Sequence, residues 1–95
     1  MMRPEDFFEE GKLYRFTERW LEENEESDFT IFRNRYMSAI PVPTDVTLMF
    51  LHLYDRKLVS TLGYKVYAWF LVGDQILGCM VPQVWAVNEM FERAK

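Results

Sequence analysis

Two apolar segments, residues 66–72 and 75–81, constrain the fold more than any other feature, because only Gly73 and Asp74 separate them. A Gly-Asp pair between two β-prone segments is typical of a two-residue type II′ or I′ turn, so the sequence predicts a β-hairpin. The length of the turn also fixes which residues of the two strands face each other. The predicted pairs are Val72 with Gln75, Leu71 with Ile76, Phe70 with Leu77, Trp69 with Gly78, Ala68 with Cys79 and Tyr67 with Met80.

Both faces of this hairpin are apolar, whereas a hairpin at a protein surface usually has one polar face. Either the rest of the chain covers the second face or a partner does. Trp and Tyr concentrate contact energy at interfaces, so one interpretation is a surface that binds a protein partner or a second copy of the chain. The other interpretation is that the same residues form core. The residues in question are Tyr67, Trp69, Leu71 and Met80.

The charge of the chain is unevenly distributed, with −6 on residues 1–28 and +2 on residues 29–95. This distribution argues against direct nucleic-acid binding, because phosphate contacts need clustered Lys and Arg. The longest uncharged segment, 75–88, is shorter than the roughly 18 residues that span a bilayer. The only cysteine, Cys79, has no partner for an internal disulfide. We therefore expect a soluble, cytoplasmic protein that contacts neither nucleic acid nor a membrane.

Residues 18–28 form the most acidic segment, with six acids and one base. Like charges at this density favour a solvated loop, with a short helix beginning after Thr17, whose hydroxyl caps free amide groups. Trp20 and Leu21 are its only large apolar residues, and we expect them to attach its start to the core. The acidic-loop residues are Glu18, Glu22, Glu23, Glu25, Glu26 and Asp28.

Shorter patterns organise the rest of the chain, which we expect to form one domain over residues 1–95. Pro4 and Gly11 are placed to begin and end a helical lead-in within residues 1–11. Alternation predicts a strand over 12–17. Further β-prone segments are 29–33, 36–40, 46–54 and 58–62. Alternation along 46–54 predicts that one face carries Val46, Leu48, Phe50, His52 and Tyr54. Residues 83–95 fit a helix that begins after Pro82, and they fit a strand as well.

The order of these strand candidates resembles an SH3-like barrel: KLYRFT, a long polar loop, VTLMFLHLY, YKVYAWFLV, QILGCMV and a Pro-led turn at VPQVW, over roughly residues 12–92. Leu53-Tyr54-Asp55 is similar to part of the ALYDY stretch of peptide-binding SH3 domains. Arg56 replaces the second tyrosine of that stretch, and no binding residue is carried over. The predicted fold is mainly β, a five-stranded SH3-like barrel or curled antiparallel sheet with short N-terminal and C-terminal helical segments. The alternative is an α+β fold with a C-terminal helix packed on the sheet.

Catalytic, metal-binding and cofactor-binding patterns are absent from the sequence. His52 is the only histidine and Cys79 the only cysteine, and the glycines are spaced for turns rather than for a phosphate cradle. We therefore expect a non-enzymatic protein-binding module, of the kind that small phage-type accessory proteins use to inhibit a host protein. The alternative function is an acidic decoy, in which residues 18–28 occupy the basic groove of a nucleic-acid-handling enzyme.

Overall fold

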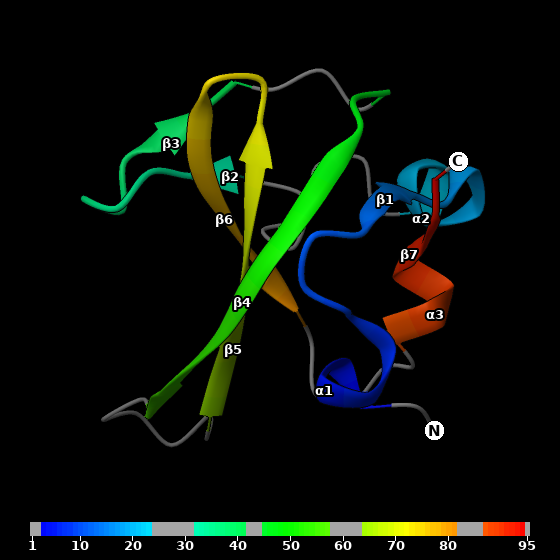
Figure 1. Ribbon diagram of the computed structural model, residues 1–95, viewed down its shortest axis with the longest axis horizontal. Coiled ribbons are helices and arrows are strands. Elements are labelled where there is room, and N and C mark those ends of the chain that lie inside the picture. The colour runs from blue at the N-terminus through cyan, green and yellow to red at the C-terminus, as the bar shows by residue number, and fades with distance from the viewer. Residues whose placement is uncertain (1–2, 24–31, 42–44, 58–63, 82–86, 95) are drawn as a thin grey trace.

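The computed structural model describes residues 3–23, 32–41, 45–57, 64–81 and 87–94, and there the chain forms a seven-stranded antiparallel sheet with three short helices (Figure 1). The strand order across the sheet is β3-β2-β6-β5-β4-β1-β7. The helices are α1 (Pro4–Phe7), α2 (Glu18–Glu23) and α3 (Val87–Met90), and the strands are β1 (Leu13–Phe16), β2 (Phe32–Arg33), β3 (Ala39–Ile40), β4 (Leu48–Lys57), β5 (Tyr64–Val72), β6 (Gln75–Val81) and β7 (Phe91–Arg93).

The hairpin of β5 and β6 confirms the predicted turn and register. All six predicted residue pairs occur, and Val66 also pairs with Val81. Gly73 has a φ of 63°, whereas Asp74 has a negative φ, which fits a type II′ turn better than type I′. One face of the hairpin is core, because its side chains are almost completely buried: Ala68, Phe70, Leu77, Cys79 and Val81.

A β-bulge in β4 changes which side chains of that strand face the core. Phe50 pairs with Phe70, but the next pair along the ladder joins His52 to Trp69, so Leu51 is an extra residue. The prediction that His52 shares a face with Phe50 is therefore wrong. Beyond the bulge, Leu53 packs against the core and His52 is exposed.

The sheet curls strongly around an aromatic core without closing. Phe16 of β1 and Phe32 of β2 belong to strands that three others separate, yet their ring centroids are 5.7 Å apart. Phe8, which follows α1, stacks on Phe50 at 4.6 Å and contacts Phe70 and three further rings. The mainly β prediction is confirmed, and of its two forms the curled antiparallel sheet agrees with the described residues better than the five-stranded barrel, which is wrong. The sheet has seven strands and does not close, and the helices and Phe8 lie over its open side.

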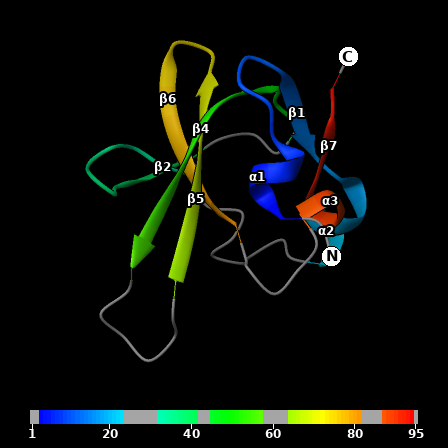
Figure 2. The same cartoon turned by 60° about the horizontal axis from the view of Figure 1, so that its bottom comes forward.

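All three helices lie on the same side of β4, β5 and β6, on the right in Figure 1 and again in Figure 2. The first helix begins at Pro4 as predicted, and Gly11 has a φ of 80° before β1. The predicted first strand is confirmed, because β1 buries Tyr14 and Phe16 and leaves Leu13 exposed.

The C-terminal segment combines the two structures that its sequence fits. One helical turn, α3, is followed directly by β7, which pairs with β1. A full C-terminal helix on the sheet is therefore wrong for the described residues, because the chain turns into a ladder at Phe91. The predicted strand over 58–62, the segment 29–31, the second half of the acidic segment and residues 82–86 lie outside the described residues.

Candidate functional site

The candidate site is the face of the sheet that points away from the helices, which we call the outer face. On this face, successive strands align a row of four aliphatic side chains: Leu13 of β1 pairs with Met49 of β4, Met49 with Leu71 of β5, and Leu71 with Ile76 of β6. Pairing partners in an antiparallel ladder project from the same face, so these side chains form a continuous apolar strip. We call it the aliphatic row.

The aliphatic row is accessible to solvent, most of all at its two ends. Leu13 is 38% exposed and Ile76 is 56% exposed, while Met49 and Leu71 between them are half-buried. Tyr36 is the third exposed large hydrophobic residue in the described part of the chain, and it lies in the turn between β2 and β3. Two of these three residues therefore belong to one row on one face, which distinguishes the row from scattered surface apolar residues.

A second row, parallel to the first, is built around Trp69 and Gly78. The indole lies flat on β6: a Cβ atom added to Gly78 would lie 3.0 Å from Cε3 of Trp69 and 3.1 Å from two other ring atoms. On the opposite side, the rings of Trp69 and His52 are 6.4 Å apart and inclined by 24°. We call this the aromatic row. It gives the outer face a flat aromatic surface beside the aliphatic row.

The predicted protein-binding residues fall on the outer face but differ in accessibility. Trp69, Leu71 and Met80 are half-buried, whereas Tyr67 is only 7% exposed and offers little contact area. The sequence-based set missed three of the four residues of the aliphatic row. Ile76 lies in the hairpin itself, whereas Leu13 and Met49 lie on strands outside it. For Leu13, the sequence signal was the alternation of residues 12–17, which places Leu13 on the face of the strand opposite to Tyr14 and Phe16.

Charged groups on the outer face are few and mostly paired. The Nε of Arg15 lies 2.9 Å from Oε1 of Glu92, an exposed ion pair between β1 and β7. Arg33 stands beside Gly78 in the register, and its guanidinium donates a hydrogen bond to the carbonyl oxygen of Met37 at 3.0 Å. Among the described side chains of this face, Glu92 is the only carboxylate, so the face is close to neutral.

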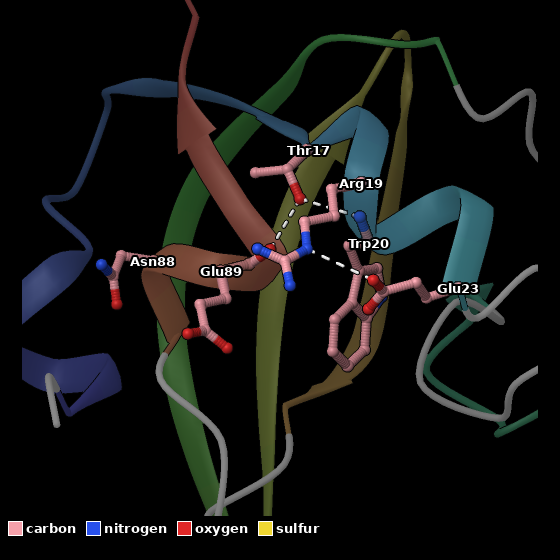
Figure 3. Close-up of a pocket in the computed structure, with 6 residues that line it drawn as sticks. All are labelled: Thr17, Arg19, Trp20, Glu23, Asn88 and Glu89. Atoms are coloured by element: carbon pink, nitrogen blue, oxygen red, sulfur yellow. Dashed lines mark hydrogen bonds and ion pairs between the residues drawn. The ribbon is translucent and has the colours of Figure 1, made fainter.

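A separate cleft of about 280 Å³ lies between α2 and α3, and its lining is Thr17, Arg19, Trp20, Glu23, Asn88 and Glu89. Figure 3 shows Arg19 and Glu23 of α2 beside the indole of Trp20, with Glu89 of α3 on the other side of the Arg19 guanidinium. The Arg19 Nε donates to Glu23 Oε1 at 3.2 Å.

The predicted N-terminal cap of α2 forms one wall of this cleft. The Thr17 hydroxyl accepts a hydrogen bond from the Trp20 amide at 3.2 Å and donates to the Glu89 carbonyl at 2.6 Å. Trp20 is 3% exposed and Leu21 packs against the core, so both residues attach the helix as expected. Glu18, Glu22 and Glu23 are exposed on α2, while Glu25, Glu26 and Asp28 lie outside the described residues.

Groups suited to catalysis or metal binding are not brought together in the described residues. No three His, Cys, Asp or Glu side chains there are placed to hold a metal ion. Burial raises the pKa of the Cys79 thiol, so it stays protonated and unreactive in the folded chain. The ring of His52 lies beside the ring of Trp69.

Comparisons with protein-family models, with curated proteins and with solved structures returned no match to this sequence. None of the three helices in the described residues has the length and apolar character that crossing a membrane requires.

Proposed function

We propose that the protein is a non-enzymatic protein-binding module that docks through its outer face. The observation that carries the proposal is the aliphatic row, whose end residues Leu13 and Ile76 are among the few exposed large hydrophobic residues described. A continuous apolar strip on the outer face of the sheet is favourable to bury against a complementary surface. The role of such a module, as an accessory or inhibitor of a host protein, belongs to the same proposal.

Aromatic and aliphatic rows make distinct contributions to this docking surface. Met49, Leu71 and Ile76 supply apolar area, and Trp69 supplies a rigid flat ring, which is the kind of residue that dominates binding energy at protein interfaces. Because Gly78 fixes the ring against β6, Trp69 loses little conformational freedom when a partner covers it.

The proposal is tested by comparing two substitutions of exposed apolar residues. Ile76→Glu introduces a carboxylate into the aliphatic row, while Tyr36→Glu changes another exposed large hydrophobic residue, which lies in the β2–β3 turn outside the row. Full-length variants are tagged and purified from native host cells, and their partners are quantified by mass spectrometry. We expect Ile76→Glu to lose its partner by at least about tenfold and Tyr36→Glu to keep it. Equal recovery with both variants contradicts the proposal.

A second candidate function, the acidic decoy, is supported by the carboxylates on the helical side. Glu18, Glu22 and Glu23 are exposed on α2, and Glu89 is exposed on α3 across the cleft. Binding through these groups should weaken steeply as salt rises, because exposed charges are screened within about 8–10 Å at moderate ionic strength. Charge reversal at Glu22, Glu23, Glu25 and Glu26 should abolish it. Salt-insensitive binding rules the decoy out.

A further inference from the structure

We propose that the cleft between α2 and α3 binds an arginine side chain of a basic partner protein, whose guanidinium takes the place of the chain's own Arg19. The inference deepens the acidic-decoy function and rests on it for the nature of the partner, because a basic groove presents arginine side chains. The cleft has a volume of about 280 Å³. Pockets for drug-sized ligands measure roughly 300–1,000 Å³, so this cleft suits one side chain better than a cofactor.

The charges that line the cleft favour a cation. Glu23 of α2 and Glu89 of α3 lie on either side of the Arg19 guanidinium (Figure 3). Arg19 binds only one of these two carboxylates. Its Nε lies 3.2 Å from Oε1 of Glu23, whereas Glu89 has no ion pair among the described side chains. The described lining therefore holds one carboxylate more than its single base neutralises.

Arg19 shows which kind of group the cleft accepts, because it is a guanidinium that already lies between the two helices. Its side chain is 85% exposed and that of Glu23 is 53% exposed. Exposed ion pairs contribute little to stability, so Arg19 can rotate into the solvent at small cost. The planar guanidinium of a partner then binds Glu23 and Glu89 together, since it has five N–H donors in a fixed fork.

The two helices are held at a fixed separation, which preorganises the cleft. The Thr17 hydroxyl accepts a hydrogen bond from the Trp20 amide of α2 at 3.2 Å and donates one to the Glu89 carbonyl of α3 at 2.6 Å. Trp20 lines the cleft and is only 3% exposed, so it anchors α2 to the core. Only the side chains of Glu23 and Glu89 need to reorient around the incoming cation, which lowers the entropic cost of binding.

The experiment is an NMR titration of the full, isotope-labelled chain with N-acetyl-arginine amide at constant ionic strength. The probe is added up to about 50 mM, because a single exposed ion pair gives weak binding. The signals of the Trp20 indole and of the Asn88 and Glu89 amides should shift and reach saturation. N-acetyl-citrulline amide has nearly the same shape without the charge and should cause no saturable shift.

Two matched pairs of variants locate the site, and circular dichroism confirms that each variant is folded. Glu89→Gln should weaken binding by about two- to fivefold, the effect of one exposed ion pair, whereas Glu92→Gln, on β7 outside the cleft, should not. Arg19→Gln should strengthen binding by a similar factor, because it removes the resident guanidinium. Arg15→Gln changes the net charge equally but lies outside the cleft, so it should leave binding unchanged.

Three results of the titration overturn the inference: no saturable shift even with Arg19→Gln, equal shifts with the citrulline probe, or equal effects within either pair of variants. If the host partner is lost as salt rises while the arginine probe does not bind, the decoy function stands and the cleft is excluded as its contact. Salt-insensitive binding of the host partner also overturns the inference, because it excludes the basic groove as the source of the arginine.

Discussion

Phe16 and Phe32 lie on strands that β4, β5 and β6 separate in the sheet, yet their ring centroids are 5.7 Å apart at an angle of 62°. Such a contact is possible only because the sheet curls until its two ends share one core. Phe16 also stacks on Phe91 at 4.9 Å, so the C-terminal strand belongs to the same cluster. The curl separates an inner aromatic core from the outer face on which the aliphatic row lies.

The Phe16–Phe32 contact should be energetically coupled. Phe16→Leu and Phe32→Leu should each destabilise the fold by about 0.5–3 kcal/mol, the usual range for point substitutions. The double variant should lose about 0.5–1.5 kcal/mol less than the sum of the two, because an edge-to-face aromatic pair can be lost only once. Urea unfolding of the four proteins measures this difference. Additive losses would mean that the two ends of the sheet do not meet.

Gly78→Ala should destabilise the fold by about 1 kcal/mol, because the new Cβ would lie 3.0 Å from the Trp69 ring, which would have to shift by a few tenths of an ångström. The same substitution in a Trp69→Leu background should cost much less, since the smaller side chain leaves space. Denaturant unfolding measures the stability, and tryptophan fluorescence reports the displaced ring. An equal cost in both backgrounds would contradict the flat placement of the indole.

Thr17→Val should lower stability by about 1 kcal/mol, as removal of a helix N-cap typically does. The hydroxyl bonds both the Trp20 amide and the Glu89 carbonyl, so its loss loosens α2 from α3 as well. Thr17→Ser retains the hydroxyl and serves as the matched control. Amide hydrogen exchange at Trp20 should quicken in the Val variant only; similar exchange in both variants would argue against the cap.

Folding stability should decrease as pH rises above about 8.5, the usual pKa of a thiol. Burial raises the pKa of Cys79 in the folded chain, so the folded state keeps a proton that the unfolded state loses. The contribution is fully present below the unfolded pKa and falls by up to about 1.4 kcal/mol per pH unit above it. Urea unfolding at pH 8 and pH 10 measures the slope. Cys79→Ala should show a shallower slope than the native chain, and equal slopes would exclude burial of the thiol.

Local sequence signals predicted the parts of the fold that local chemistry determines. The two-residue turn at Gly73 and Asp74 fixed every pair of the β5–β6 hairpin, because strand register follows from turn length. Likewise, the hydroxyl of Thr17 and the apolar Trp20 marked the start of α2. Counting from the turn correctly placed Tyr67, Trp69, Leu71 and Met80 on one face, but it left open whether that face is core or interface.

Other features depend on contacts between distant segments and had no local signal. The bulge at Leu51 inserts one residue into β4, and from that point strict alternation assigns side chains to the wrong face. The row that joins Leu13 to Ile76 depends on the pairing of β1 with β4, which is separated from it in the chain by two other strands. The short strands β3 and β7 lie within the predicted segment 36–40 and within residues 83–95, which fit a helix and a strand equally well. The sequence therefore left open a five-stranded barrel and a curled antiparallel sheet, and the structure has an open sheet of seven strands.

The most direct test of docking through the outer face is site-specific photo-crosslinking in native host cells, with benzoyl-phenylalanine placed at Ile76 in one variant and at Tyr36 in another. Both positions are exposed, so both side chains can react with any protein that covers them. The account predicts a discrete protein adduct from position 76 and only background from position 36. An absence of adduct at position 76, or equal adducts at both positions, would contradict it.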